Sequence, residues 1–577
     1  CTTLDQSKLL LNADLKWKTR NANYQLQETK SSLQFLHIKM SLPMVGLQGM
    51  LKGGTKNLSG LEEAVYMNIK ACKELSSVSR TSLGPHGLFK MIVNRLEKLI
   101  ITKNAVQVTS ELEVKHPAAK MIVMAAANQA MEYGDGTNLV ITLAGELLQQ
   151  AESLLQQGIV VQDIVNGYEK AFDFIQKNVD SLLTPKLNPQ NELDLQKLIR
   201  SAIGSKNYNN EQLISNLVSK AVLQIVVDGD FNADFVRVAK IQGGCLEDSF
   251  VVRGLVLPVV PRGTVQKMDN CKIAVFSCPV ELRETETKGT ILLENAAELQ
   301  TLSKNEEVIY EELILSFKAM GVNVIVSQMN IHELALHYCN KHGIMVLKIS
   351  SKYETKRFAV SVGAEINSIC KKGECLQAGS CTSIHVEEIG DKKVILCRDE
   401  SSAQRQIASV VLRAATENVL NDVALAIGNG INVAKVAFTQ NEFVAGGGAA
   451  ELELSLQLKK LAAIEPGLEQ YSVRAFAEAL EIIPRTLAET AGLNADQVIA
   501  ELTSKHVAGQ VNFGVDVEAV QKTVDSTEIG VYDNKAVKMW AIRSAVDAAV
   551  SILKVDQVVM RKQAGGPNAP QNQPLDA

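Results

Sequence analysis

Apolar side chains recur at helical spacing through most of the first 230 residues. Between residues 58 and 82 they fall three or four positions apart, which predicts one helix that ends before a turn at 83–87. Beyond the turn, two short runs rich in Ile predict a pair of strands, and longer periodic stretches predict helices. The expected ranges are 90–94 and 99–102 for the strands, and 117–131, about 138–157 and most of 159–230 for the helices.

The pattern changes near residue 232, where stretches of Val and Ile replace the helical period. Three β-like stretches are followed by a helix whose apolar face carries Ile309, Leu313, Phe317 and Met320, and Gly321 ends this helix. Strand, helix and strand then alternate, which is the βαβ pattern of a parallel sheet. The expected ranges are 235–241, 249–258 and 272–276 for the β-like stretches, and 322–326, 331–341 and 345–349 for the alternating elements.

Helical spacing resumes after a last predicted strand at 392–397. The expected helices cover 403–420, 449–461 and 472–491. A β/α segment therefore interrupts a helical one, and we expect the helical pieces from the two ends of the chain to fold together. The predicted fold class is a multidomain protein with α+β and α/β parts.

Composition narrows the classes of function. The 577 residues exceed what one core supports, and 46% hydrophobic with 21% charged residues is typical of a soluble globular protein. A net charge of −5 disfavours a nucleic-acid partner, and no 18-residue apolar run predicts a membrane span. Ten scattered cysteines indicate reduced thiols in the cytoplasm. Cys370, Cys375 and Cys381 lie close together, but their spacing disfavours a zinc site.

The two ends of the chain differ from the rest. Residues 1–43 lack a sustained apolar period and a signal-peptide core, so we expect a disordered or non-native extension, with the folded protein beginning near Met40 or Met44. The tail at 563–577 is rich in Pro, Gln, Asn and Gly and is expected to be flexible.

Three glycine-centred turns, each at a predicted helix boundary, carry the clearest chemistry. They are LGPHG at 83–87, GDGTN at 134–138 and GGG at 446–448. The second begins a helix, where free backbone amides and the helix dipole favour phosphate, and Asp135 could hold the Mg²⁺ that accompanies it. Glycines also form ordinary turns and helix caps, and none of the three turns matches the Walker pattern. The residues alone leave both readings open.

The order of the motifs resembles the group II chaperonins. TSLGPHG at 81–87, ELEVKHPAAKM at 111–121 and GDGTN at 134–138 are followed by GGGAAE at 446–451 and FAEALEIIPRTLAE at 476–489. The resemblance runs from about residue 45 to 565, nearly the whole chain. Within the eukaryotic t-complex chaperonins, DGTN at 135–138, ALHYCNK at 335–341, VDQVVM at 555–560 and AGGP at 564–567 point to one of the eight paralogues.

The resemblance implies the group II chaperonin fold with three domains. An equatorial ATP-binding domain is built from both ends of the chain, an intermediate domain acts as a hinge, and an inserted apical β/α domain grips client protein. The implied ranges are 44–157 and 421–562 (equatorial), 158–232 and 385–420 (intermediate), and 233–384 (apical). The charge-rich stretch at 282–307 would form a helical protrusion that closes the chamber, with a solvated helix face as the alternative.

The resemblance also implies ATP or ADP and Mg²⁺ as ligands. It places Asp135 on the metal, Asp533 on the ribose, and Lys206 where it senses the γ-phosphate; a solvated surface lysine is the alternative for Lys206. The other implied nucleotide-binding residues are Leu83, Gly84, Pro85, Gly136, Thr137, Asn138, Gly446, Gly447, Gly448 and Gly514.

Two asparagines depart from the family pattern. Asn104 stands where the family carries an aspartate after the second short strand, and Asn429 stands where we place the aspartate that activates the attacking water. Asparagine is nearly isosteric with aspartate but cannot take a proton, and loss of a general base costs on the order of 10²–10⁴ in rate. This predicts a subunit that binds ATP and hydrolyses it slowly. The alternative is a shifted register, or a neighbour such as Asp422 as the base.

As partners, the resemblance implies seven paralogous subunits in a double ring of eight per ring, and non-native clients such as actin and tubulin. ATP turnover would drive lid closure through a hinge. Two rival functions stay open. A purely structural ring subunit would neither bind nor hydrolyse nucleotide, which the retained Asp135, Thr137 and three glycines disfavour. A free-standing small-molecule ATPase or kinase would need an intact catalytic acid or base, which the two asparagines disfavour.

Overall fold

The computed structural model describes most of the chain. The described residues are 56–59, 64–94, 97, 99–185, 187–226, 229, 231–281, 296–370, 377–390, 392–398, 407–518 and 521–560. The predicted extension at 1–43, the predicted tail at 563–577, residues 282–295 of the predicted protrusion, and Cys375 lie outside them.

The chain divides into two compact units, formed by residues 1–67 with 555–577 and by residues 68–554. In the first unit β1 (Lys56–Ser59) pairs antiparallel with β17 (Gln557–Met560). The helix predicted from residue 58 is therefore wrong at its start, because residue 58 lies in β1 and α3 (Tyr66–Arg80) begins only at Tyr66. Local spacing does not reveal a strand partner that comes from the other end of the chain.

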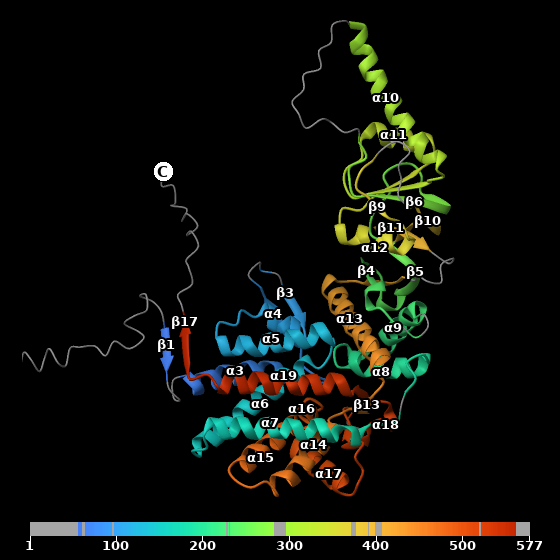
Figure 1. Cartoon of the computed structure of the whole chain (residues 1–577). Helices are drawn as coiled ribbons and strands as arrows, with labels where there is room; N and C mark the ends of the chain where they lie inside the picture. The colour runs from blue at the N-terminus through green and yellow to red at the C-terminus, as the bar shows by residue number, and fades with distance from the viewer. Residues whose placement is uncertain are drawn as a thin grey trace, which may run out of the picture. The chain divides into compact units, whose positions relative to one another are not determined.

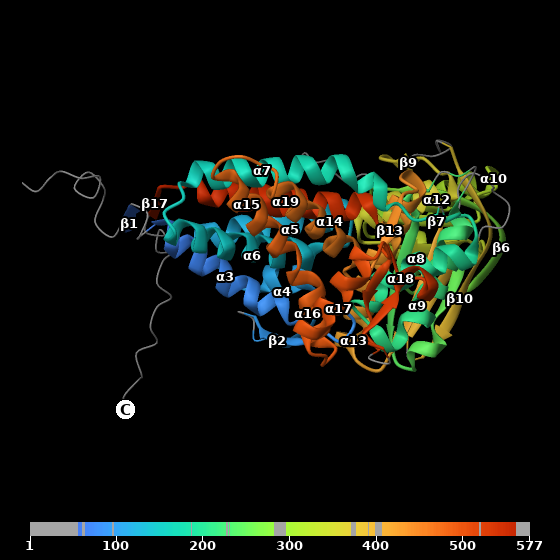
Figure 2. The ribbon, with the colours of Figure 1, turned by 90° about the horizontal axis from the view of Figure 1, so that it is seen from below.

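Helices from early and late parts of the sequence pack together in the larger unit. α19 (Lys535–Leu553) packs on α5 (Pro117–Glu132) and α6 (Thr137–Gln156), and α15 (Glu469–Leu480) packs on α6 and α7 (Val161–Asn178). Figures 1 and 2 show the blue and cyan early helices beside the orange and red late ones. Segments that are hundreds of residues apart thus share one core.

Close contacts explain why these helices fit. The Tyr168 hydroxyl donates to the Leu147 carbonyl at 2.8 Å, and its ring lies edge-on to Phe476 with centroids 5.7 Å apart. Gly145 brings α6 against α3, because a Cβ there would lie 2.2 Å from the Cβ of Ser76. Interiors packed to this density tolerate little added volume.

The same part of the larger unit holds further helices and three two-stranded sheets. The helices are α4 (Ala105–Glu111), α14 (Ala449–Ala462), α16 (Ile482–Thr490), α17 (Ala495–Val507) and α18 (Ser526–Ile529). The sheets pair β2 (Lys90–Val93) with β3 (Leu99–Thr102), β13 (Phe443–Ala445) with β16 (Tyr532–Asn534), and β14 (Phe513–Val515) with β15 (Thr523–Asp525).

A second group of helices packs against the end of a large sheet. α8 (Glu192–Gly204), α9 (Glu211–Ile225) and α13 (Glu417–Thr439) share an aliphatic core with β4 (Val236–Gln242) and β12 (Ala408–Ala414). Short 3₁₀ turns lie at Val179–Leu182, Tyr208–Asn210, Ala233–Phe235 and Leu246–Asp248. Within the described residues, no helix is long and apolar enough to cross a membrane.

The large sheet has nine strands in the order β4-β12-β5-β11-β10-β6-β7-β8, with β9 also paired to β6. The strands not yet introduced are β5 (Phe250–Leu257), β6 (Lys267–Phe276), β7 (Val324–Ser327), β8 (Met345–Lys348), β9 (Ile366–Asn367), β10 (Gly379–Ile389) and β11 (Lys392–Arg398). β6, β7 and β8 are parallel, and α11 (Glu333–Lys341) connects β7 to β8, so the predicted βαβ pattern is confirmed.

Helices cover both faces of the parallel part of this sheet. α12 (Lys352–Val362) packs on the face that carries Ile273 and Val275. α10 (Ala296–Ala319) and α11 pack on the other face, with Phe276 among the buried side chains. Successive residues of β6 thus face opposite cores, as the period of a strand requires.

Two further predictions about helices are wrong. Residues 408–414, predicted as helix, form β12, which pairs with β4 on one side and β5 on the other. A strand buried on both faces has a continuous apolar run, which spacing alone does not distinguish from a helix. The stretch 472–491, predicted as one helix, is two, with α15 and α16 separated at Glu481.

Candidate functional site

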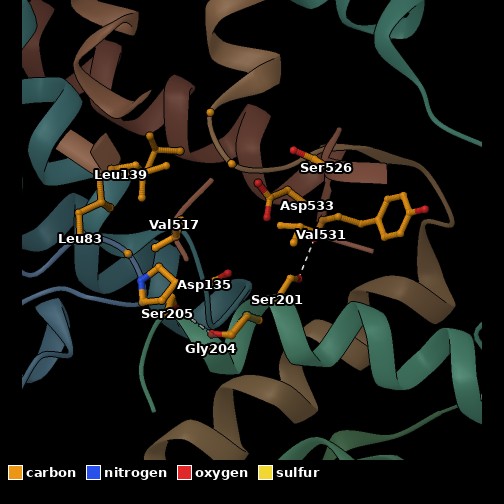
Figure 3. A pocket seen from close by; sticks show the side chains of 18 of the residues that line it. Leu83, Asp135, Leu139, Ser201, Gly204, Ser205, Val517, Ser526, Val531 and Asp533 are labelled. Carbon is orange, nitrogen blue, oxygen red and sulfur yellow. Dashed lines mark hydrogen bonds between the residues drawn. The ribbon is translucent and has the colours of Figure 1, made fainter. Parts of the chain in front are cut away.

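A cavity of about 330 Å³ lies where the early and late helices meet the end of α8. The turns at 83–87, 134–138 and 446–448 all contribute to its lining. In the view of Figure 3, Leu83 stands on the left of the cavity and Asp533 on the right. The volume falls in the range of sites for small organic ligands.

Most residues that the sequence predicts for the site line this one cavity. They are Leu83, Gly84, Pro85, Asn104, Asp135, Gly136, Thr137, Asn138, Lys206, Gly447, Gly448 and Asp533. Gly446, Gly514 and Asn429 are not among the lining residues. The turns at 134–138 and 446–448, more than 300 positions apart, therefore border the same space.

The first turn requires glycine at one position. Gly84 has a φ of 83°, and a Cβ there would lie 2.6 Å from a methyl carbon of Leu487. Lys103 donates from Nζ to the Pro85 carbonyl at 3.0 Å and so ties the turn to the end of β3. Burial lowers the pKa of Lys103 to about 8, with the nearby Asp422 opposing. Lys103 therefore stands beside the first turn at the edge of the cavity, and its ammonium loses a proton more easily than that of an ordinary lysine.

The second turn presents the start of a 20-residue helix to the cavity. Gly134 and Gly136 have φ of 73° and 77°, and Gly136 is the N-cap of α6 without a side-chain hydrogen bond. Gln129 donates from Nε2 to the carbonyls of Asp135 and Val537 at 3.0 and 3.1 Å, which fixes the turn against α19. The first backbone amides of α6 are therefore left for a ligand, and the helix dipole favours an anion there.

Asn138 serves the fold through its side chain. Its Oδ1 accepts hydrogen bonds from the hydroxyls of Ser79 at 2.7 Å and Thr142 at 3.3 Å, and its Nδ2 donates to the Ser79 carbonyl at 3.2 Å. The side chain thus joins α6 to α3. A ligand in the cavity would meet the backbone of Asn138 rather than its amide group.

Lys206, just after α8, reaches the second turn. Its Nζ lies 3.2 Å from Oδ1 of Asp135 and 3.3 Å from the Gly134 carbonyl. Only 12% of the Lys206 side chain is exposed, so a solvated surface position does not describe it. The contact places one cation and one acid at the start of α6.

The glycines at 446–448 are held from behind by a small hairpin. Ser526 donates from Oγ to the Gly446 carbonyl at 2.9 Å, and the Val515 backbone amide donates to the Gly447 carbonyl at 3.0 Å. Gly514 packs so closely that a Cβ would lie 2.5 Å from Ser526 Oγ. Gly446 and Gly514 therefore shape the wall without lining it, while Gly448, the N-cap of α14, faces the cavity.

Asn104 lies in a short hydrogen-bonded chain at the cavity wall. The backbone amide of Asn104 donates to Thr102 Oγ1 at 3.2 Å, and that hydroxyl donates to Oδ1 of Asp422 at 3.1 Å. Burial raises the pKa of Asp422, with Thr102 and Lys103 opposing. Asp422, the alternative general base considered in the sequence analysis, is thus linked through the Thr102 hydroxyl to Asn104 at the cavity wall.

Asn429 is further from the cavity. It lies on α13, one helical turn before Val433, which is the α13 residue that the cavity contacts. Asp422 is two turns earlier on the same helix. Neither Asn429 nor Asp422 lines the cavity, and the role predicted for Asn429 stays a prediction.

Charge in the lining is mixed. Five cations and six acids contribute, namely Lys103, Lys197, Arg200, Lys206 and Lys538 with Asp135, Glu211, Glu451, Asp516, Glu518 and Asp533. The sequence did not single out Lys103 or Lys538. Lys103 directly precedes Asn104 and could have been found from that position, whereas Lys538 reaches the cavity only because β16 turns into α19.

A buried histidine supports the wall from outside the lining. His506 has no exposed side-chain surface; its Nδ1 lies 3.0 Å from Oε2 of Glu453 and its Nε2 lies 2.9 Å from the Phe513 carbonyl. A carbonyl can only accept, so Nε2 is the nitrogen that donates to Phe513, and Nδ1 faces the Glu453 carboxylate. The pair joins α14, which starts at the glycine turn, to β14.

Glu453→Gln should lower the thermal unfolding midpoint at pH 7, and the difference from the unchanged protein should narrow only as pH falls below about 4.3. The hydrogen bond from His506 lowers the pKa of Glu453, with burial opposing. Stability from a lowered carboxyl pKa is present above the unfolded value of about 4.3 and is lost as pH falls through the folded value. Loss of one partner of such a pair costs about 1–3 kcal/mol.

Glu489→Gln is the matched control for Glu453→Gln. Glu489 pairs with Arg80, but 46% of the Glu489 side chain is exposed, and exposed pairs contribute little. Equal losses in the two variants at pH 7, or a Glu453→Gln difference that stays constant with pH, would contradict the role of the buried pair.

Comparisons with known proteins agree with the resemblance. Residues 75–563 match the model of the TCP-1/cpn60 chaperonin family. T-complex protein 1 subunit theta of Dictyostelium discoideum is 43% identical over 540 residues, which is 92% of this chain and 100% of that protein. The proteins of the same name from Arabidopsis thaliana and Homo sapiens are each 42% identical, over 92% and 91% of this chain and 97% and 96% of their own length.

These matches confirm the predicted family and fold class, and the paralogue to which the late motifs pointed is the theta subunit. The mixed architecture, with helices from both ends packed together and a β/α segment inserted between them, is consistent with a multidomain group II chaperonin fold. The chain belongs to the TCP-1/cpn60 chaperonin family.

Proposed function

We propose that this chain is a subunit of a hetero-oligomeric cytoplasmic chaperonin, that it binds ATP with Mg²⁺, and that it hydrolyses ATP slowly. One observation carries the proposal: two uncapped helix N-termini, those of α6 and α14, open on the same cavity beside Asp135. Backbone amides at helix starts are the usual partners of phosphate.

Each wall of the cavity suits one part of the nucleotide. The amides that follow Gly136 and Gly448 would hold the phosphates, and Asp533 would accept hydrogen bonds from the ribose. Leu83 and Pro85 offer apolar surface near the first turn. Asp135 would hold Mg²⁺, which when bound neutralises phosphate charge and fixes the phosphate geometry. Lys206 would meet the terminal phosphate after leaving Asp135.

We attribute slow turnover to Asn104, whose neutral side-chain amide lies at the cavity wall. Asn104 lines the cavity but cannot accept a proton from water. Asp422 can, but one of its oxygens is engaged by Thr102, and Asp422 does not itself line the cavity. We propose that Asp422 supports the residual hydrolysis and that Asn429 takes no direct part.

The assembly is proposed from the family. Seven paralogous subunits would complete a ring of eight, and two rings would enclose non-native clients of the actin and tubulin type. The hairpin β2–β3 fits a subunit contact, because Met91 and Val93 are 67% and 63% exposed on a small two-stranded sheet. Large apolar side chains in that setting usually meet a partner.

Purified rings that contain this chain should carry nucleotide at its site and release phosphate from it slowly. Photo-crosslinking with an azido-ATP, followed by identification of the labelled subunit, reads occupancy. Single-turnover hydrolysis in rings whose other subunits carry an inactivating change reads this subunit's rate. Labelling with slow phosphate release supports the proposal. No labelling would instead favour the purely structural subunit, and release as fast as that of the paralogues would contradict slow turnover.

A further inference from the structure

A buried lysine stands between two acids at the wall of the cavity. Lys538, in the first turn of α19, is buried, and its Nζ lies 2.8 Å from Oε2 of Glu451 and 2.9 Å from Oδ2 of Asp533. Glu451 belongs to the first turn of α14, directly after the glycine turn, and Asp533 belongs to β16. All three side chains line the cavity. One ammonium therefore joins two of its walls.

The three charges depend on one another. Burial raises the pKa of Asp533, Lys538 opposes the rise, and Glu451 and Asp135 add to it. Burial also disfavours the charged form of Lys538, but Asp533 and Glu451 raise its pKa above the ordinary value. Lys538 thus stays a cation, and its 2.9 Å contact favours the ionised form of Asp533, which can only accept hydrogen bonds.

Asp533 is the member of this cluster that a ligand can reach. Its side chain is 35% exposed, compared with 11% for Lys538 and 4% for Glu451. Because Lys538 holds Oδ2, a donor in the cavity would meet Oδ1 of a carboxylate whose orientation is already set. Orientation fixed before binding reduces the entropy that a ligand must otherwise offset.

The cluster of Lys538, Glu451 and Asp533 also affects the part of the cavity where the phosphates would bind. A carboxylate in the first turn of α14 would repel an anion at the start of that helix. Lys538 draws the Glu451 carboxylate to itself and offsets its charge. Removal of the lysine would leave two acids, both near the bound nucleotide, without their shared cation.

We propose that Lys538 is a positioning residue that holds the Asp533 carboxylate toward the ribose hydroxyls and thereby sets a preference for ribonucleotides over deoxyribonucleotides. This inference rests on the proposed function, because it presumes that a nucleotide occupies the cavity. Sugar hydroxyls are donors and an ionised carboxylate is an acceptor, so the pairing is chemically matched. A site built to bind a hydroxyl rejects the analogue that lacks it, and at a partly exposed site we expect about tenfold discrimination.

The test compares ATP with 2′-deoxy-ATP and 3′-deoxy-ATP on the full chain in the assembled ring, with Mg²⁺ present. The unchanged protein should bind ATP about tenfold more tightly than at least one of the deoxy analogues. Lys538→Met should abolish the roughly tenfold difference in affinity between ATP and that analogue, while repulsion from the unpaired acids weakens the binding of both nucleotides alike. Lys538→Arg, which keeps the charge, should retain at least part of the preference.

Two control variants separate positioning from a loss of structure. Glu451→Gln leaves Lys538 paired with Asp533 and should keep the discrimination. In Lys538→Met with Glu451→Gln, one unpaired buried acid is removed, so the unfolding midpoint should recover while the discrimination stays lost. Discrimination that survives in Lys538→Met, or returns in the double variant, overturns the inference. An unchanged protein that binds both ATP and its analogues without preference overturns it as well, whereas one that binds none of them overturns the proposed function itself.

Discussion

Asn104→Asp is expected to raise the rate of ATP hydrolysis at this subunit by on the order of 10². The residue lines the cavity, and a carboxylate there can accept the proton of an attacking water where an amide cannot. The fold should tolerate the change, because Asn104 caps α4 by accepting from the Val106 amide at 3.3 Å, and aspartate is an equally good N-cap. The measurement is single-turnover phosphate release in rings where only this subunit is changed.

Three further variants decide which acid matters. Asn104→Ser keeps a helix cap without adding charge and should leave the rate as it is. Asp422→Asn should lower the residual rate by on the order of 10² or more, because it removes the acid bonded to Thr102 behind the wall. Asn429→Asp should change little, since the cavity meets α13 at Val433. A large gain from Asn429→Asp with none from Asn104→Asp would reverse this assignment.

The elements that the sequence predicted well are those whose cause is local. The turns at 83–87 and 134–138 need glycines and begin or end helices, so their positions could be inferred from the residues, whereas the residues alone left their phosphate chemistry open. The βαβ unit around α11 likewise follows from alternating apolar runs and a helical period within 30 residues. In each case the information lies within one short, continuous stretch of sequence.

What could not be predicted depends on distant partners. The sequence of β12 is a continuous apolar run that suits a buried helix as well as a buried strand, and its pairing with β4 and β5 identifies it as a strand. Lys538 belongs to no motif in the sequence, and its ion pair with Glu451 exists only because the fold places α14 beside it. The aspartate position assigned to Asn429 came from counting along the chain and stays a prediction, because counting does not tell which residues of α13 line the cavity; Val433 does and Asn429 does not. A motif thus indicates the kind of site more readily than it indicates which residue of a helix faces that site.

Asp135→Asn is expected to weaken binding of ATP with Mg²⁺ by about 10², and to tighten binding of metal-free ATP several-fold. Asp135 is the acid of the turn that starts α6, so it is the carboxylate placed to share a metal with the phosphates. A bound metal contributes several kcal/mol, and each 1.4 kcal/mol is tenfold in affinity. Without metal the same carboxylate repels the triphosphate, and the neutral amide removes that repulsion.

The opposite signs of these two effects separate a metal ligand from a merely structural acid. Titrations of the full chain in rings, with nucleotide at high Mg²⁺ and with a chelator, give both affinities. Lys206→Met is the matched control: it breaks the same 3.2 Å ion pair but keeps the acid, so binding should still require Mg²⁺. Glu211→Gln removes a lining acid that pairs with Arg200 rather than with Lys206 and should leave the metal dependence unchanged. If Asp135→Asn weakened binding equally with and without Mg²⁺, its carboxylate would be shaping the turn rather than holding the metal.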